Sequence, residues 1–364
     1  MNITDIDDTV MKETQKTGIA RADIAKKYER LFRQDAAALG IMPADKYPHV
    51  SDYVERMAAT VQKLMKTRAA YKDEKCRVFF DISRFPSYGK LAGVKIRGEK
   101  IVIREEYKPF QAGDFLLLSK CREKNCEKCF ETNMGKCRPA WNVQCATMAT
   151  AELGSSIDIS VGGQDNLFNH HENTRAIADT LCGHEFSKYY VHVRHLIVDG
   201  KKMSKSKGNA VLLPDLLAHG ITLREARMLL LSVHYRKRLN FTWKFAKAIK
   251  MRSLGMRKAV NALKNAERKQ GEADGAGREG FSEFAADALK EFEASLDDNM
   301  DLPSALSVAE KFARECADEI CRSTHSANAR QASRHGDAGL SKKQARAALM
   351  LLRKFDSVLA CLPL

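Results

Sequence analysis

The sequence has neither a long apolar run nor a basic leader. In its 364 residues no uninterrupted apolar stretch reaches the roughly 18 residues that a membrane-spanning helix needs. The first residues carry Asp5, Asp7 and Asp8 but no basic residue, which argues against a secretory signal peptide. No internal repeat and no heptad run is present. We therefore expect a cytoplasmic globular protein with no membrane partner.

Cysteine is not scarce, but it is unevenly placed, and the charge is one-sided. Four of the ten cysteines fall between Cys121 and Cys137. Without a secretory signal, such a cluster favours reduced thiols or a metal site over disulfides. The net charge of +15 suggests a polyanionic partner, with nucleic acid as the first candidate, and a merely soluble basic protein is the alternative. The length suggests two or three domains.

Local patterns predict helices at both ends and mixed structure between them. Two or three amphipathic helices are expected in residues 11–75, with apolar residues at helical spacing. Short β-branched and aromatic runs predict strands at 76–82, 101–103, 115–118, 157–159 and 195–198. Further helices are expected at 214–264 and 281–364, with a linker at 271–277 and a polar break near 326–339.

A lysine-rich loop follows the last of these strands. The segment 201–209 holds four lysines, two serines and a glycine between an apolar strand and a helix. Such a loop can close over a triphosphate, and its ammonium groups stabilise a pyrophosphate leaving group when a carboxylate attacks the α-phosphorus. A solvated basic turn is the alternative. The string Lys202-Met203-Ser204-Lys205-Ser206 matches in full the KMSKS motif of class I aminoacyl-tRNA synthetases.

Other segments resemble the cysteinyl-tRNA synthetase family, in the family's order. Residues 162–173 are similar to its GG-x-D-x-x-F-P-H-H-E-N segment. Residues 2–8 resemble its NITDIDD segment, and 135–145 resemble its GKGRPGWHIEC segment. Further similarities lie at 80–91, 234–241 and 296–306. The resemblance covers essentially the whole chain.

The resemblance implies both a fold and an activity. The fold is α/β, a partial Rossmann-type class I synthetase catalytic domain with an α+β insertion, followed by an α-helical (DALR-like) bundle. The expected domains are the helical and inserted part at 1–138, the nucleotide-binding part at 139–245 and a tRNA-binding bundle at 246–364. The implied activity is that of a cysteine–tRNA ligase, with ATP, cysteine and tRNA as substrates.

The resemblance also implies site residues. Lys202 and Lys205 are the expected catalytic lysines, with Lys205 contacting ATP. The expected nucleotide- and amino-acid-binding residues are Gly163, Asp165, Ser204, Ser206 and Trp141. Asp165 suits a ribose hydroxyl, and the alternative is a turn or cap aspartate. Trp141 would wall the amino-acid pocket, and the alternative is a structural tryptophan.

The zinc site of the family is only partly present. The family binds zinc through two Cys, one His and one Glu, and here Cys145 and His170 are the matching metal ligands. The Glu position is Thr174, and the first Cys has no counterpart in the chain. Two ligands rarely hold zinc, so His171 or a cysteine from a partner would have to supply a third. The alternative is an inherited but empty pair.

Other differences concern the front of the chain and the pocket. The family begins with a Cys-bearing strand and a HIGH-type motif, and neither is found here. A mis-called start, a split gene and a true truncation stay open, so we expect the ligase to need an N-terminal half, which a separate chain could supply. Two family histidines are replaced by Asn142 and Ser160. These changes keep two alternatives open, a non-catalytic tRNA- or nucleotide-binding paralogue and a ligase for another carboxylate or acceptor.

The cysteine cluster is an addition to the family pattern. Its spacing is Cys121-x4-Cys126-x2-Cys129-x7-Cys137. Four thiolates so close together could form a structural zinc knuckle, with Cys126 and Cys129 as its CxxC half. Free surface cysteines on a variable loop are the alternative.

Overall fold

The computed structural model divides the chain into two compact units. The first comprises residues 1–36 and 42–194, and the second comprises 37–41 and 195–364. The structure describes residues 1–97, 100–102, 113–121, 129–204, 208–268, 277–326 and 339–364. Within these ranges, no helix combines the length and the apolar character needed to cross a bilayer. The division into 1–138, 139–245 and 246–364 stays a prediction.

Helices form the N-terminal part of the first unit. They are α1 (Asp8–Thr17), α2 (Arg21–Ala38), the short 3-10 turn η1 (Val50–Tyr53) and α3 (Val54–Lys66). Asp7 caps α1, because its Oδ1 accepts a hydrogen bond from the Thr9 amide at 2.6 Å. Along α3, the apolar residues at helical spacing are buried, as the sequence predicts. On α2 only some of the apolar residues at helical spacing are buried, since Ile24 is buried but Tyr28 is 46% exposed.

An antiparallel sheet forms the insertion expected from the sequence. Its strands are β1 (Ala70–Lys72), β2 (Val78–Phe80), β5 (Phe115–Lys120) and β6 (Cys137–Pro139), in the order β1-β2-β5-β6. The 3-10 turn η2 (Ile82–Arg84) follows β2, and β3 (Lys95–Arg97) pairs with β4 (Lys100–Val102) as a separate hairpin. Phe80 and Leu117 lie in one buried apolar cluster with Leu64 of α3, which ties this sheet to the helix.

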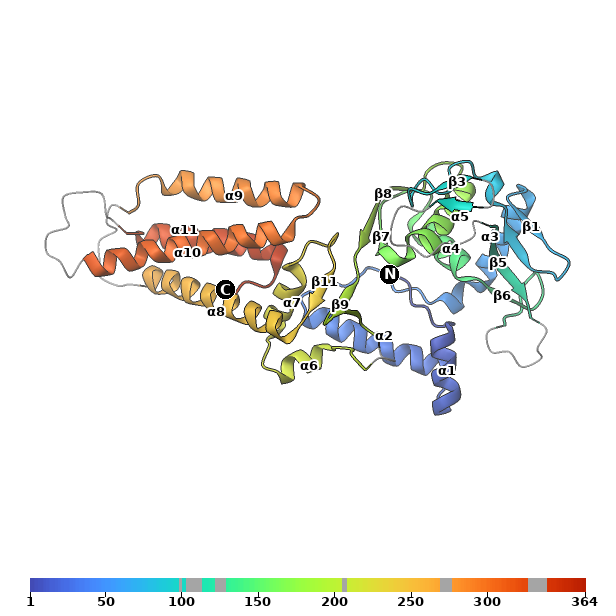
Figure 1. The fold of residues 1–364 in the computed structure, drawn as a ribbon, viewed down its shortest axis with the longest axis horizontal. Coiled ribbons are helices and arrows are strands. Elements are labelled where there is room, and N and C mark those ends of the chain that lie inside the picture. The colour runs from blue at the N-terminus through green and yellow to red at the C-terminus, as the bar shows by residue number, and fades with distance from the viewer. Residues whose placement is uncertain (98–99, 103–112, 122–128, 205–207, 269–276, 327–338) are drawn as a thin grey trace. The chain divides into compact units, whose positions relative to one another are not determined.

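Two parallel strands and the helices beside them complete the first unit. These elements are α4 (Trp141–Leu153), β7 (Ile157–Gly163), η3 (Gln164–Asn166), η4 (Leu167–Glu172), α5 (Asn173–Cys182) and β8 (Ser187–Val193). β7 and β8 pair in parallel, with Ile159 opposite Tyr189. A parallel pair needs a crossover, and η3, η4 and α5 supply it. Helices α4 and α5 pack against each other beside the strands (Figure 1).

The second unit begins with a small mixed sheet. Its strands are β9 (Leu196–Val198), β10 (Lys201–Lys202) and β11 (Leu239–Phe241), in the order β10-β9-β11. β9 and β10 are joined by Asp199 and Gly200, whose φ values of 47° and 74° suit a two-residue hairpin turn. The prediction of helix throughout 214–264 is wrong at Leu239–Phe241, because β11 pairs in parallel with β9.

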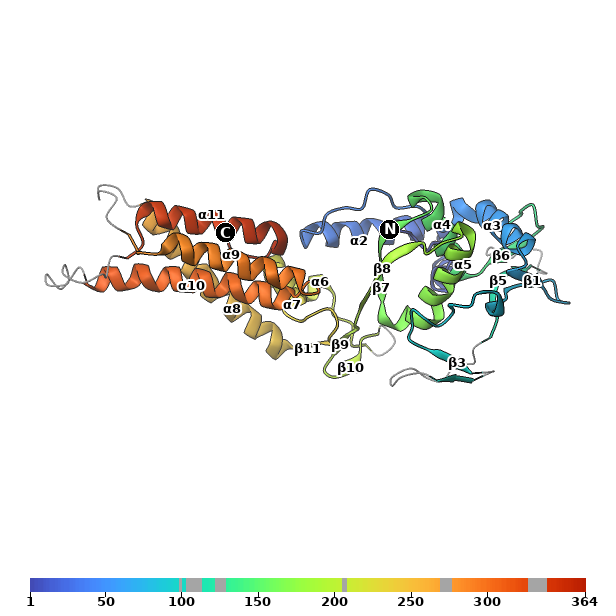
Figure 2. The same ribbon diagram turned by 90° about the horizontal axis from the view of Figure 1, so that it is seen from above.

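Helices make up the rest of the second unit. They are α6 (Leu213–Ala218), α7 (Leu223–Leu231), α8 (Trp243–Arg268), α9 (Phe281–Asp297), α10 (Leu302–Ser326) and α11 (Lys342–Leu359). The last four lie side by side as a bundle in both views (Figures 1 and 2). Its core includes Phe292, Phe312 and Phe355, all nearly inaccessible to solvent. Most of the predicted linker and polar break lies outside the described residues.

Candidate functional site

The carboxyl end of β7 gathers the polar residues of the first unit. Parallel sheets commonly bind ligands at this edge. Gly162 and Gly163 end the strand, and both are closely approached by side chains. A Cβ on Gly162 would overlap the His171 ring, and one on Gly163 would lie 2.7 Å from Asp165 Oδ1. Glycine is required here by the close approach of side chains to the strand. Asp165 is exposed in η3, and its nucleotide-binding role stays a prediction.

Cys145, His170, Asn142 and Trp141 form a compact cluster between α4 and η4. The His170 Nε2 atom lies 3.2 Å from Cys145 Sγ, and its Nδ1 atom lies 2.7 Å from Asn142 Oδ1. The Trp141 ring stacks on the His170 ring at a centroid separation of 3.8 Å. Because an amide oxygen only accepts hydrogen bonds, Nδ1 of His170 carries the proton and its Nε2 lone pair faces the thiol.

Burial keeps this pair uncharged. It lowers the pKa of His170 to about 3, with a smaller contribution from His171. It also raises the pKa of Cys145 to about 11, against a lowering hydrogen bond from Asn2. At neutral pH the cluster is therefore a thiol beside a neutral imidazole.

The described residues do not provide a zinc-binding set at Cys145 and His170. Within these parts of the chain no group of three His, Cys, Asp or Glu side chains is placed to hold a metal ion. Thr174 Oγ1 is buried without a hydrogen-bond partner among the residues that the structure describes, and a threonine hydroxyl is not among the usual zinc ligands. His171 does not complete the set, because its Nδ1 is 2.7 Å from Nε2 of His192. The metal-ligand roles of Cys145 and His170 stay predictions.

A buried ionic network lies next to the cluster, and the sequence motifs did not reveal it. The Arg175 guanidinium pairs with Glu172 at 3.1 Å and with Asp179 at 3.3 Å. Glu172 is fully buried and also accepts a hydrogen bond from the Ala92 amide at 2.9 Å. Burial raises the pKa of Glu172 and outweighs the lowering effect of these partners. The network ties α5 to the loop after β2. Its signal was the spacing of Glu172, Arg175 and Asp179 at three and four residues.

A cavity adjoins Trp141. Its volume is about 580 Å³, and its wall includes Thr4, Asp7, Arg138, Trp141 and Gln144. Gln144 is 6% exposed, and its Oε1 atom has no hydrogen-bond partner in the described structure. Trp141 is 47% exposed, so it is not the buried structural tryptophan of the alternative interpretation. A ligand in this cavity would therefore meet an exposed aromatic wall, whereas the Gln144 Oε1 atom is itself buried.

The stem of the lysine-rich loop is ordered by one asparagine. Asn209 Oδ1 accepts a hydrogen bond from the Ser204 amide at 2.9 Å, and its Nδ2 donates to the Lys202 carbonyl at 3.3 Å. Lys202 is exposed at the end of β10. Lys205 and Ser206 lie outside the described residues, so their predicted roles are untested. Lys202 and Ser204 belong to the second unit, whereas Asp165 and Trp141 belong to the first.

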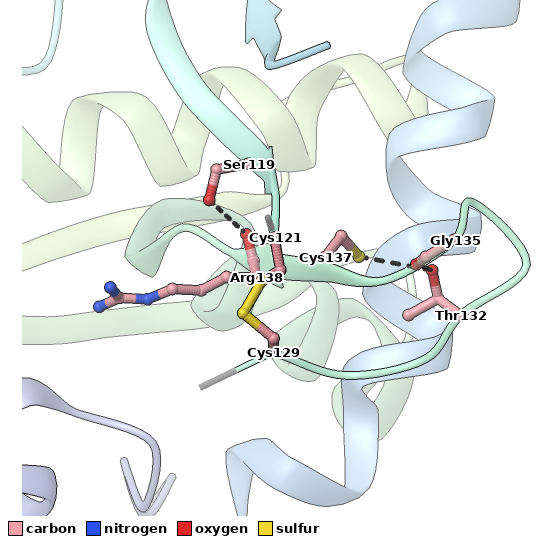
Figure 3. The surroundings of a disulfide bond; sticks show 7 residues. All are labelled: Ser119, Cys121, Cys129, Thr132, Gly135, Cys137 and Arg138. Atoms are coloured by element: carbon pink, nitrogen blue, oxygen red, sulfur yellow. Dashed lines mark hydrogen bonds between the residues drawn. A yellow bond between two sulfur atoms is a disulfide. The ribbon is translucent and has the colours of Figure 1, made fainter. Parts of the chain in front are cut away.

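The cysteine cluster differs from both interpretations of the sequence. Cys121 and Cys129 form a disulfide, with their Cα atoms 5.9 Å apart (Figure 3). The preference for reduced thiols or a metal site is wrong for this pair, because their Cα atoms lie at a distance that a disulfide spans. Two of the four proposed knuckle ligands are thus unavailable as thiolates. Cys137 is buried against Thr132 Oγ1 at 3.4 Å, and Cys126 lies outside the described residues.

Comparisons with known proteins agree on one group of enzymes. Residues 1–250 match the family described as "tRNA synthetases class I (C) catalytic domain". A cysteine–tRNA ligase of Chlamydia muridarum is 34% identical over 100% of this chain and 75% of its own length. Another, of Chlamydia felis, is 40% identical over 73% of this chain, and the match spans 56% of that relative.

A solved structure resembles the fold as well. It is a methionyl-tRNA synthetase of Mycobacterium tuberculosis bound by methionyl-adenylate, with a TM-score of 0.64 and 15% identity. The match covers 96% of this chain and 80% of that one. At this identity the likeness concerns the fold alone. With the family match, it confirms the predicted α/β catalytic domain followed by a helical region.

Proposed function

Because the chain belongs to the cysteinyl-tRNA synthetase family of class I aminoacyl-tRNA synthetases, we propose that it acts in cysteine–tRNA ligation. In the first step the carboxylate of cysteine attacks the α-phosphorus of ATP and pyrophosphate leaves. In the second, a ribose hydroxyl at the 3′ end of tRNA attacks the carbonyl of cysteinyl-adenylate and AMP leaves. We place this reaction in the cytoplasm.

The observation that carries the proposal is the contact between Trp141 and His170, together with Asp165 directly after β7. Asp165 follows the strand, Trp141 stacks on His170, and Trp141 also walls the 580 Å³ cavity. The exposed Asp165 carboxylate suits the ribose of ATP, and Gly163 lets it lie against the strand. The cavity beside Trp141 is large enough for an amino acid, and Trp141 gives it an aromatic wall.

The lysine-rich loop supplies the charge that the first step needs. We assign the stabilisation of the leaving pyrophosphate to Lys202 and Lys205, with Ser204 and Ser206 as further phosphate donors. The Asn209 hydrogen bonds support this role, since they hold the backbone on both sides of Met203. A fixed stem lets the following residues close over the nucleotide without refolding the hairpin.

The second unit offers basic residues for the tRNA backbone. Arg236, Lys237, Lys258 and Arg268 are exposed, and we propose that they pair with phosphates. Arg252 is not in this group, because its guanidinium pairs with Glu310 at 2.8 Å and joins α8 to α10. Binding through phosphates weakens steeply with salt, so tRNA affinity should fall as ionic strength rises.

Two parts of the family's apparatus have no counterpart among the 364 residues. No His-x-Gly-His string occurs in the sequence, and a zinc ion at Cys145 and His170 would need at least one more ligand. We propose that catalysis requires a HIGH-type segment in addition to residues 1–364. In this proposal, zinc binding at Cys145 and His170 requires a cysteine ligand from such a segment.

Cysteine-dependent exchange of pyrophosphate into ATP tests the proposal. We expect no exchange with residues 1–364 alone, and exchange when a HIGH-type segment of a cysteinyl-tRNA synthetase is added. Lys205→Ala should abolish the restored exchange. Lys16→Ala is the control, because Lys16 lies on α1 and has no role in the proposed site, and this variant should keep the exchange. Robust exchange by residues 1–364 alone would refute the requirement for the segment.

A non-catalytic paralogue that binds tRNA is the second candidate. It rests on the replacement of family residues by Asn142, Ser160 and Thr174, and the relatives named cysteine–tRNA ligase do not favour it. This candidate predicts salt-sensitive tRNA binding without exchange, even when the HIGH-type segment is present and shown to bind. The two candidates therefore separate in the same experiment.

A further inference from the structure

We infer that the Cys145–His170 pair of this chain does not retain zinc, because position 174 carries no carboxylate, and that Thr174→Glu creates a metal site there. The family resemblance implies zinc at this pair, so the inference is a disagreement between the resemblance and the residues present. It concerns metal binding alone and does not depend on the proposed ligase activity.

Half of a metal site is already built. Cys145 Sγ and His170 Nε2 lie 3.2 Å apart, so both donor atoms can face one ion after a small separation. The Asn142 oxygen, 2.7 Å from His170 Nδ1, holds the tautomer whose Nε2 lone pair is available. A carbonyl in this position is the usual support of a metal-binding histidine. The hydrogen bond that orients the histidine is therefore present, whereas the pair offers only two metal ligands.

Position 174 is the place where the third ligand is lacking. It lies four residues after His170, about one turn on, where η4 passes into α5. Its Oγ1 atom is buried and lacks a hydrogen-bond partner within the described residues. An unsatisfied buried hydroxyl of this kind destabilises the folded chain. A glutamate is two bonds longer than threonine and would bring a charged oxygen donor to this side of the pair.

Neighbouring side chains do not replace it, because they are engaged elsewhere. His171 is turned toward His192, with 2.7 Å between the two ring nitrogens. Glu172 is fully buried and binds Arg175 and the Ala92 amide. Moving either residue to the pair would break a buried hydrogen bond or leave a buried charge unpaired. A metal at Cys145 and His170 would thus lack a third ligand from this part of the chain.

The test compares metal binding by the full chain and its variants. Wild type, Thr174→Glu and Thr174→Gln are purified with added zinc and dialysed, and zinc is then counted per chain. Co²⁺ titration follows, because a cobalt–thiolate bond gives a charge-transfer absorption. Thr174→Gln is the matched control, since glutamine has the same size as glutamate but no charge. Cys145→Ser in each background separates this site from the cysteines near Cys121.

We expect no Cys145-dependent zinc in the wild type or in Thr174→Gln. Thr174→Glu should bind Co²⁺ at least about tenfold more tightly, with a thiolate absorption that Cys145→Ser removes. Zinc that wild type retains through dialysis and loses on Cys145→Ser would overturn the inference. So would equal cobalt affinity of folded Thr174→Glu and Thr174→Gln. Neither readout involves ATP, cysteine or tRNA, so a failed ligase assay leaves this result standing.

Discussion

Gly162→Ala probes the close contact between β7 and the histidines of the site. A Cβ at Gly162 would overlap the His171 ring, so the ring has to move and its 2.7 Å hydrogen bond with His192 is lost. Overpacking costs about 1–3 kcal/mol and the hydrogen bond about 0.5–1.5 kcal/mol. The sum is a destabilisation of the first unit by roughly 1.5–4.5 kcal/mol.

Gly255→Ala is the matched control, because the substitution is the same but the expected change in the free energy of unfolding has the opposite sign. Apart from the backbone of its own helix and its chain neighbours, no atom in the described part of the chain lies within 4 Å of a Cβ at Gly255, which is inside α8. Alanine should therefore stabilise the second unit by about 0.5–1 kcal/mol. Urea unfolding followed by tryptophan fluorescence separates the units, since Trp141 reports on the first and Trp243 on the second. Each variant is measured with the other tryptophan replaced by phenylalanine. A Gly162→Ala chain within about 0.5 kcal/mol of its parent would refute the close-contact argument.

Two further predictions concern buried groups outside the proposed nucleotide site. Arg175→Met should destabilise the first unit by about 3–5 kcal/mol at neutral pH, because Glu172 keeps an unpaired buried charge. The loss should shrink in acid, where Glu172 is protonated, and a loss independent of pH would contradict the role of charge. Burial raises the pKa of Cys316 to about 12, so its alkylation at pH 8 should be on the order of 1,000-fold slower than that of exposed Cys321. Equal labelling rates of the two cysteines would refute the burial of Cys316. The Cys316 thiol of the unfolded chain loses its proton near its ordinary pKa of 9.0. The contribution of this group to the free energy of unfolding should therefore fall as the pH rises from there toward about 12.

Helix positions were predictable where one face is strongly apolar. The residues at Val54, Met57, Val61 and Leu64 repeat every three or four positions and are all buried in α3. The strand Leu239–Phe241 was missed because its pattern has only three residues. Its pairing with β9 depends on a segment about 40 residues earlier, which local periodicity does not report.

The candidate site residues were predicted from sequence motifs, whereas the contacts between their side chains were not. The motif around Asp165 and His170 predicts a site in this segment, and the structure adds that Trp141 stacks on His170. The hydrogen bond from His170 to Asn142 arises only when α4 meets η4, so the sequence showed the replacement but not its consequence. The disulfide between Cys121 and Cys129 was not predicted either. The spacing and the lack of a secretory signal led us to expect thiols or a metal site instead of a bridge.

The transfer of labelled cysteine to tRNA tests the central claim most directly. The assay combines residues 1–364, ATP, a HIGH-type segment and tRNA, with Asp165→Ala and Lys205→Ala as variants. The account predicts charging of tRNA with cysteine that requires both the segment and residues 1–364 and is lost in both variants. Charging that persists unchanged in both variants, or its absence when the segment is bound, would contradict the account.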